Sequence, residues 1–175
     1  INSYVGILND LLKHGTYRAS DIAVLTTYSS QRTLLQQRLK NSIGEGLFVE
    51  TIDKAQGMER SIILVSLVRS SIASKSIGFV SDPRRLNVAI TRAKAGLIII
   101  GNAVTLIEGE HYGCWTSFLK HLNSRRCIVN SEIWPTSLSE ILHGYEIDES
   151  KFVKSDGAKL KMEYTYLQRG RVLSE

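Results

Sequence analysis

Two arginines, Arg85 and Arg92, lie seven positions apart in the segment DPRRLNVAITRAK. On a helix this spacing places both guanidinium groups on one stripe, with Val88 and Ala89 between them. A charged group on the inner side of a helix needs a partner of opposite charge, because burying an unpaired charge is costly. A protein carboxylate and a phosphate both suit a guanidinium. The residues by themselves leave these two partners open.

A second polar segment, TIDKAQGME, runs from Thr51 to Glu59. Thr51 and Asp53 lie at the end of a predicted strand, and ligands of doubly wound sheets bind beyond the carboxyl ends of strands. The same two residues could form an Asx turn that caps a short helix at Lys54, and the two roles are compatible with each other. Gly57 would let another group approach the backbone closely, and it could equally be a turn residue.

Apolar patterns predict the elements that position these residues. Asp82 and Pro83 open a helix that covers residues 84–94 and ends at Gly96. Short apolar runs predict strands of a buried parallel sheet at residues 22–26, 48–52, 61–68 and 97–100, and an edge strand at 127–129. Amphipathic stripes predict helices at residues 3–14, 104–107, 115–122 and 137–142, and one with Leu34, Leu35 and Leu39 on its inner face. Residues 71–81 are predicted to form a loop or a short hairpin. Strands that alternate with helices in this way predict an α/β fold with a doubly wound parallel sheet.

The composition is that of a globular chain with a basic end. Its 175 residues carry a net charge of +5, which is compatible with a polyanionic partner. From residue 146 on the apolar pattern fades, and residues 151–175 hold six Lys or Arg against three Asp or Glu, so a flexible or partner-bound tail is predicted. No apolar run reaches the roughly 18 residues of a membrane span. Cys114 and Cys127 are interpreted as reduced thiols of an intracellular protein, cytoplasmic or nuclear.

The segments TIDKAQGME and DPRRLNVAITRAKAGLIIIGN, with an apolar run between them, closely resemble the C-terminal motor domain of superfamily 1 helicases, within them the Upf1-like group. The resemblance is strong over residues 22–102. It implies a RecA-like α/β fold, which is a doubly wound, mostly parallel sheet with helices on both faces. Residues 1–145 would form the second RecA-like motor domain and residues 146–175 a basic C-terminal tail or extension. The start at Ile1, without a methionine, adds the expectation of a fragment of a longer chain.

The resemblance implies a nucleotide site in the cleft between two motor domains. Arg92 matches the arginine that reaches across the cleft to the γ-phosphate and spreads the charge that develops in phosphoryl transfer. Gln56, Gly57 and Glu59 match the element between nucleic acid and nucleotide, with Glu59 accepting a hydrogen bond from a ribose hydroxyl. A solvated or arginine-paired carboxylate is the alternative for Glu59.

Arg85 has two interpretations. Its place in the second motif assigns it to the nucleotide site beside Arg92. A structural ion pair with Glu59 or Asp82 is the alternative.

The resemblance also implies a track for single-stranded nucleic acid. Thr51 and Asp53 would lie against its backbone, with the Thr51 hydroxyl or N–H donating to a phosphate. Thr26, Thr27 and Gln31 would contact the sugar–phosphate chain as well. Many relatives have proline where this chain has Thr27, which weakens the constraint on that loop.

The chain contains no G-x-x-x-x-G-K-[ST] phosphate loop. The resemblance therefore assigns the metal and most triphosphate contacts of ATP with Mg²⁺ to an N-terminal RecA-like domain of the same chain, and no metal site is predicted here. Single-stranded RNA or DNA is the implied partner, and no membrane is. The isolated chain is expected to be inactive.

Three functions remain to be weighed. The first is the C-terminal motor half of an ATP-dependent helicase or translocase, an NTP hydrolase that acts on RNA or DNA. The second is a non-hydrolysing nucleic-acid-binding scaffold of the same fold, against which the intact Gln56, Gly57, Glu59 and Arg92 argue. The third, an unrelated nucleotide-binding domain, would need a glycine-rich turn directly after a strand, which the chain lacks.

Overall fold

The computed structural model describes residues 2–13, 15–67, 82–103, 106, 113–125, 127–130 and 163–169. Within them lies a six-stranded sheet with the order β2-β1-β3-β4-β6-β5. Its strands are β1 (Ile22–Thr26), β2 (Phe48–Thr51), β3 (Arg60–Ser66), β4 (Ala93–Asn102), β5 (Ile128–Asn130) and β6 (Glu163–Arg169). The helices are α1 (Asn2–Lys13), α2 (Ser29–Ile43), α3 (Pro83–Ile90) and α5 (Gly113–Ser124), with short 3-10 helices η1 (Ala19–Asp21) and η2 (Ile52–Ala55).

The central part of the sheet is parallel. β1 pairs in parallel with β2 and with β3, and β3 pairs in parallel with β4. β6 is antiparallel to β4, and β5 is antiparallel to β6 at the end of the sheet. The predicted strands are therefore confirmed, including the edge strand near residue 128. The predicted loop at residues 71–81 and helix at residues 137–142 lie outside the described residues.

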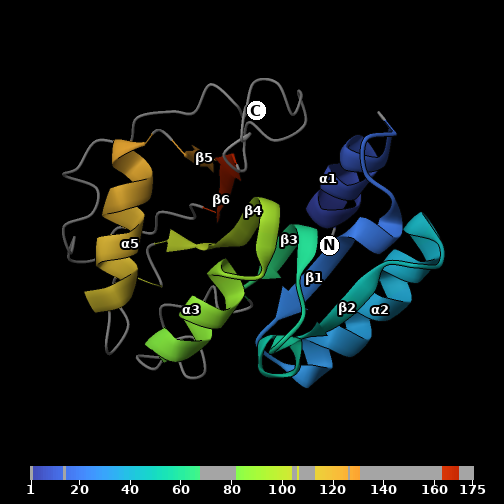
Figure 1. Cartoon of the computed structure of the whole chain (residues 1–175), viewed down its shortest axis with the longest axis horizontal. Coiled ribbons are helices and arrows are strands. Elements are labelled where there is room, and N and C mark those ends of the chain that lie inside the picture. The colour runs from blue at the N-terminus through green and yellow to red at the C-terminus, as the bar shows by residue number, and fades with distance from the viewer. Residues whose placement is uncertain are drawn as a thin grey trace.

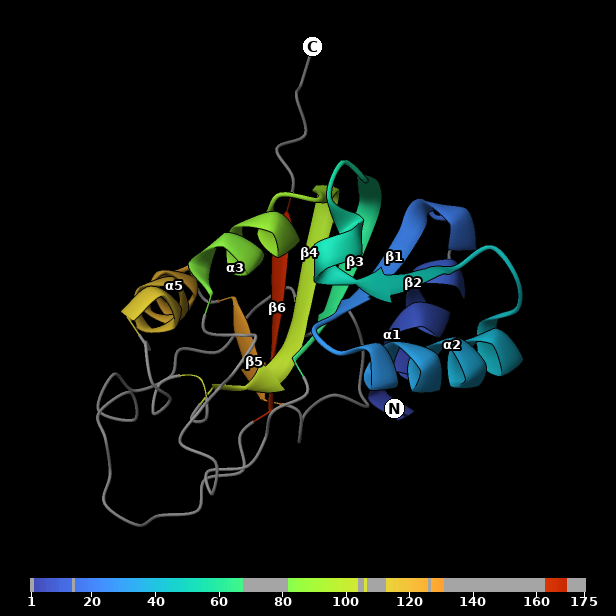
Figure 2. The ribbon, with the colours of Figure 1, turned by 90° about the horizontal axis from the view of Figure 1, so that it is seen from below.

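Helices cover both faces of the sheet, as the RecA-like expectation requires (Figures 1 and 2). α1 and α2 lie against one face, where Ile7, Leu8, Leu35 and Leu39 are fully buried. α3 and α5 lie against the other face. Leu34, predicted on the inner side of α2, is 39% exposed, so that prediction is wrong. None of the described helices is long and apolar enough to cross a membrane.

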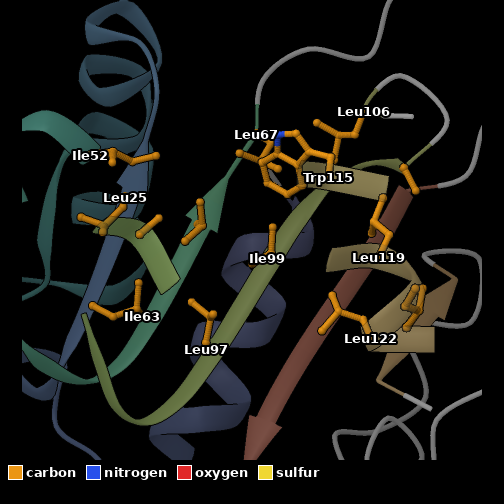
Figure 3. Packing of buried hydrophobic residues seen from close by; sticks show 14 of the residues in the cluster. Leu25, Ile52, Ile63, Leu67, Leu97, Ile99, Leu106, Trp115, Leu119 and Leu122 are labelled. Atoms are coloured by element: carbon orange, nitrogen blue, oxygen red, sulfur yellow. The ribbon is translucent and has the colours of Figure 1, made fainter. Parts of the chain in front are cut away.

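Successive residues of the central strands alternate between the two faces. On β3, Leu64 packs on the α1 and α2 side, whereas Ile63 packs on the α3 and α5 side. β4 repeats the arrangement with Ile98 and Leu97. Figure 3 shows the apolar side chains on the α3 and α5 side of the sheet, where strand side chains pack against side chains of α5 such as Trp115. Two-sided burial explains why these strands read as continuous apolar runs.

The helix α3 begins where the sequence predicts and ends earlier. The Asp82 carboxylate accepts the backbone N–H of Arg84, and Pro83 is the first helical residue. The helix stops at Ile90, whereas the sequence predicts helix up to residue 94. The reason lies in the sheet, because the carbonyl of Arg92 already accepts the N–H of Arg60 on β3 at 3.1 Å. The predicted helix stop, Gly96, is a strand residue, and Arg85 and Arg92 do not share a helical stripe.

The end of the chain contributes a strand that the sequence did not indicate. β6 pairs with β4 along its whole length, from Glu163 opposite Asn102 to Arg169 opposite Gly96. A flexible or partner-bound tail is therefore the wrong prediction for this segment. Its residues, EYTYLQR, include tyrosine and threonine, which favour strands, but charged flanks conceal the signal. The domain division at residue 145 stays a prediction.

The other end of the sheet is partly covered by a side chain. Among the described strands β2 is the terminal one, and it is four residues long. Gln36 on α2 donates its Nε2–H to the carbonyl oxygen of Val49 at 2.9 Å. One backbone acceptor of β2 is thereby bonded to a side chain of the same chain.

A tight turn leads from η2 into β3. The N–H of Met58 donates to the carbonyl of Ala55 at 3.1 Å, and Gln56 has φ −61° and ψ 130°. Gly57 follows with φ +79°. These angles are those of a type II turn, whose third residue must adopt positive φ. Gly57 is thus a turn residue, as one of the two interpretations proposed.

Leu97→Ala should destabilise the fold by about 2–5 kcal/mol, because Leu97 is 1% exposed at the centre of the sheet and its truncation leaves a cavity. Leu34→Ala removes the same atoms from an exposed position and should have little effect. Urea unfolding of both variants measures the difference. Equal losses would mean that β4 is not the centre of the packed core.

Gly57→Ala should cost about 1–2 kcal/mol, because an L-residue is strained at positive φ. An added Cβ would meet no atom within 4 Å, so the strain is confined to the backbone. Gly113→Ala is the matched control, because it also meets no atom within 4 Å and has no positive φ. Thermal unfolding of the two variants should differ, and equal melting temperatures would contradict the assigned turn.

Candidate functional site

The predicted site residues fall at two opposite edges of the parallel sheet. Thr26 at the end of β1 is in register with Thr51 at the end of β2, so both lie at what we call the carboxyl edge. Glu59 and Arg92 directly precede β3 and β4, which begin at the amino edge. Glu59 and Arg92, which the resemblance assigns to the nucleotide, are therefore separated from Thr26 and Thr51 by the length of the strands.

Arg92 lies at the amino edge in the turn between α3 and β4. Its Nε–H donates to the carbonyl of Val88 at 3.2 Å, and its Nη2 donates to the Thr91 hydroxyl at 3.0 Å. In the described part of the chain, no carboxylate lies within ion-pair distance of this half-buried guanidinium. Two neutral acceptors therefore orient the side chain, and its positive charge has no compensating carboxylate among the residues that the structure describes.

Glu59 is brought to the same edge by the sheet. It precedes Arg60, whose N–H donates to the carbonyl of Arg92, so the backbones of β3 and β4 adjoin here. The Glu59 carboxylate lies 3.6 Å from the Lys94 ammonium, and both side chains are more than half exposed. The predicted pairing of Glu59 with Arg85 is therefore wrong. Gln56 and Gly57, in the turn that precedes β3, are exposed.

Arg85 lies away from Arg92, near the beginning of α3. Its Nε–H donates to Asp53 at 2.8 Å and its Nη2 to the second carboxylate oxygen at 3.4 Å. The Asp82 carboxylate lies 3.9 Å from Arg85 Nη1, so the predicted ion pair with Asp82 is present but is the weaker of the two contacts of Arg85 with a carboxylate. Because Asp53 follows β2, this ion pair ties α3 to the carboxyl edge. A forked pair of this kind holds both groups in a defined orientation.

Ser66, at the end of β3, joins several polar groups of the carboxyl edge. Its hydroxyl lies 2.7 Å from the Tyr4 hydroxyl and accepts from Gln31 Nε2 at 3.3 Å. Its carbonyl accepts the Thr26 hydroxyl at 3.3 Å, and Thr26 is fully buried. A buried hydroxyl has no access to a nucleic-acid backbone, so the predicted contact of the Thr26 side chain is wrong. Gln31 remains half-buried and can present its amide oxygen.

Thr27 also turns its side chain inward. It is 8% exposed, and its hydroxyl has no hydrogen-bond partner among the described residues. It borders a narrow, mostly apolar recess that Arg85, Leu86 and Trp115 also line. A buried hydroxyl without a partner is costly, which marks Thr27 as a polar group in an apolar setting.

Two residues absent from the sequence predictions, Arg32 and Glu50, complete the carboxyl edge. Arg32 Nη1 donates to the Glu50 carboxylate at 3.2 and 3.4 Å, and the backbone N–H of Thr51 donates to it at 2.9 Å. Burial raises the pKa of Glu50, but these hydrogen bonds and the charges of Arg32 and Lys54 lower it, and the pKa lies below its ordinary value. The stabilisation is therefore present above the pKa of the unfolded chain and is lost as pH falls through the folded pKa.

No sequence pattern reveals this pair, because Arg32 and Glu50 are 18 positions apart on different elements. The strand register and the start of α2 bring them together. The described residues contain no group of three or more His, Cys, Asp or Glu side chains that could hold a metal ion. Both edges thus offer donors for anionic oxygen, Arg92 at one and the Arg32 and Thr51 donors at the other.

Comparison with known proteins identifies the family of the chain. A family model described as AAA domain matches residues 1–104. The chain is 39% identical over 125 residues to a regulator of nonsense transcripts 1 homolog of Neurospora crassa, covering 66% of this chain and 11% of the relative. It is 34% identical over 133 residues to the ATP-dependent helicase NAM7 of Saccharomyces cerevisiae, which covers 73% of this chain and 13% of that relative. It is 38% identical over 118 residues to the ATP-dependent helicase upf1 of Schizosaccharomyces pombe, which covers 64% of this chain and 12% of that relative.

The chain thus spans about an eighth of the length of these relatives, 11% to 13%. The family match covers more than half of the chain and includes both motifs that carry the resemblance. The helicase names among the relatives agree with it. The chain belongs to the AAA-domain family and is a Upf1-like superfamily 1 helicase domain.

Proposed function

We propose that this chain is the C-terminal motor half of an ATP-dependent helicase or translocase, and that Arg92 reaches a nucleotide bound against a second RecA-like domain. The observation that carries the proposal is the half-buried Arg92 guanidinium, oriented by Val88 and Thr91 without a carboxylate partner in the described chain. A charge held in this way is suited to an anionic partner from outside the domain. Phosphate is such a partner, because its oxygens match the guanidinium fork.

The mounting of Arg92 favours a catalytic role. Its backbone carbonyl belongs to the sheet, and its side chain is held by the end of α3, so little reorientation is needed. An arginine that compensates charge in phosphoryl transfer contributes roughly 10³–10⁵ in rate. A mobile surface arginine would first have to lose its conformational freedom.

Glu59, Gly57 and Gln56 support a nucleotide site at the same edge. The Glu59 carboxylate is exposed and contacts only Lys94 among the described cations, through a long and solvated ion pair. Such pairs contribute little, so Glu59 can exchange Lys94 for a ribose hydroxyl. The turn at Gln56 and Gly57 exposes backbone that a ribose or phosphate can approach.

The remaining parts of the active site belong, in this proposal, to an N-terminal RecA-like domain of the same chain. Mg²⁺, held by that domain, would neutralise charge on the phosphates. This chain contributes the charge of Arg92 and the acceptor Glu59. The isolated chain is therefore expected to hydrolyse ATP at most very slowly.

The carboxyl edge supports contact with single-stranded RNA or DNA. Thr51 and Gln31 are partly exposed there, and Asp53 keeps Arg85 in place beside them. Thr26 supports the edge from inside the sheet through Ser66. Contacts of this type reach phosphate and sugar and are tolerant of sequence. Each domain would grip the backbone, and closure of the cleft between them would move the strand.

Arg92→Ala in the full-length protein should lower nucleic-acid-stimulated ATP turnover by about 10³-fold, with nucleotide binding largely retained. Arg92→Lys should also fail, because an ammonium does not reproduce the fork. Arg38→Ala, which removes an exposed arginine from α2, is the control. Steady-state ATPase assays and nucleotide titration measure the two effects.

Unchanged turnover in the Arg92 variant would make Arg92 a structural residue and defeat the proposal. If the unaltered protein binds nucleic acid but has no ATPase activity, the non-hydrolysing scaffold replaces the motor.

Thr51→Val should weaken binding of a single-stranded oligonucleotide several-fold, because the hydroxyl is lost while the size of the side chain is kept. Thr33→Val is the control, since the Thr33 hydroxyl is exposed and donates to Ser29 within α2. Fluorescence anisotropy of the full-length protein measures both affinities. Equal affinities would remove the Thr51 hydroxyl from the nucleic-acid track.

A further inference from the structure

We infer that Arg32 and Thr51 form a phosphate-binding site at the carboxyl edge, and that the Glu50 carboxylate occupies the place of a phosphate in it. The site would bind the sugar–phosphate backbone of single-stranded nucleic acid. The inference rests on the proposed function and adds to it one binding residue, Arg32, and one competing group, Glu50.

The contacts of Glu50 are those that a phosphate would make. One carboxylate oxygen accepts the Thr51 N–H at 2.9 Å and Arg32 Nη1 at 3.2 Å, and lies 3.5 Å from the Thr51 hydroxyl. A backbone N–H, a hydroxyl and a guanidinium are three donor types that proteins use for phosphate oxygens. The N–H and hydroxyl of Thr51 are also the donors that the proposed function assigns to nucleic acid.

Arg32 has more to donate than Glu50 accepts. Its Nε is buried and has no hydrogen-bond partner among the described residues, although Nη1 contacts both carboxylate oxygens. An unsatisfied donor in a charged group is costly. A phosphate has more acceptor oxygens than a carboxylate, so at the exposed part of the guanidinium it can accept from more donors than Nη1, the only one that Glu50 uses.

The surrounding charges favour an anion at this place. The side chains of Arg32 and Glu50 are 27% and 18% exposed, so their interaction is less screened than that of a surface pair. Lys54 adds positive charge close to Glu50. Asp53, the next acidic residue along the chain, is already paired with Arg85. Without the charge of Glu50, the end of β2 would carry the uncompensated charges of Arg32 and Lys54.

Glu50 would therefore act as an internal competitor for the nucleic-acid backbone. A phosphate that enters must displace the carboxylate from Arg32 and Thr51, and the carboxylate can return when the phosphate leaves. Affinity at this contact is lowered and exchange is made easier. A motor that moves along a strand needs contacts that release as readily as they form.

Glu50→Gln in the full-length protein should bind a single-stranded oligonucleotide about tenfold more tightly, because a neutral amide competes poorly with phosphate for a guanidinium. The slope of log K against log salt should steepen by about 0.7, as one more phosphate is neutralised. Anisotropy titrations at several salt concentrations, with RNA and DNA strands of one sequence, measure both quantities. A gain restricted to one strand type identifies that backbone as the ligand of the site.

Glu45→Gln is the matched control. It removes the same charge from an exposed carboxylate that pairs with Lys40, and it should change neither affinity nor slope. In the Glu50→Gln background, Arg32→Gln should abolish both gains. An equal gain in the Glu45 variant would reduce the effect to net charge and overturn the inference.

Weaker or unchanged binding by Glu50→Gln, in a protein that still binds nucleic acid, overturns this inference alone and makes Glu50 a positioning residue for Thr51. Absence of nucleic-acid binding in the unaltered protein overturns the proposed function and this site with it. Should Glu50→Gln not fold, Glu50→Asp keeps the charge but withdraws the carboxylate, and a smaller gain in affinity is expected. No gain in that variant overturns the inference equally.

Discussion

Burial of the central strands on both faces is the constraint on which the rest of this structure depends. β1, β3 and β4 pack against helices on either side, so the side chains in the middle of these strands are apolar. Polar chemistry is excluded from the middle of these strands and is confined to the ends of the strands and the segments that enter and leave them. Arg92 and Glu59 therefore gather where strands begin, and Thr51 and Gln31 where strands end. The two halves of the proposed mechanism are held at a fixed separation by the rigid sheet between them.

Patterns formed by residues close together in the sequence were sufficient to predict most of the fold. The apolar runs of β1, β3 and β4 and the cap at Asp82 are local signals, and the structure agrees with them. The end of α3 is different, because the pairing of Arg92 with Arg60 on β3 determines it. β6 is different for the same reason, since it is determined by pairing with β4. Ile99 of β4 lies opposite Tyr166 of β6, and the two residues are more than 60 positions apart in the sequence. Tertiary pairing overrides helix propensity in the first case and supplies the missing signal in the second.

The candidate site divides in a similar way. Motifs identify which residues belong to it, but ion-pair partners follow from three-dimensional proximity. Arg85 pairs with Asp53 because α3 packs beside η2, and Glu59 pairs with Lys94 because β3 and β4 are adjacent. Thr26 belongs to the matched motif and yet is buried, because it is still a strand residue when the motif begins. The motif match assigns no role to Arg32 or Glu50, and only the fold brings these two residues together.

The hydrogen bond from Gln36 to Val49 has a consequence for the solubility of the domain. An exposed terminal strand offers unpaired carbonyl and N–H groups on which another chain can extend the sheet. On β2, the Gln36 amide already donates to one backbone carbonyl, that of Val49, so this carbonyl is occupied by a side chain of α2. Together with the shortness of β2, this contact protects against sheet-to-sheet association. α2 therefore covers the apolar core and at the same time discourages polymerisation at that edge.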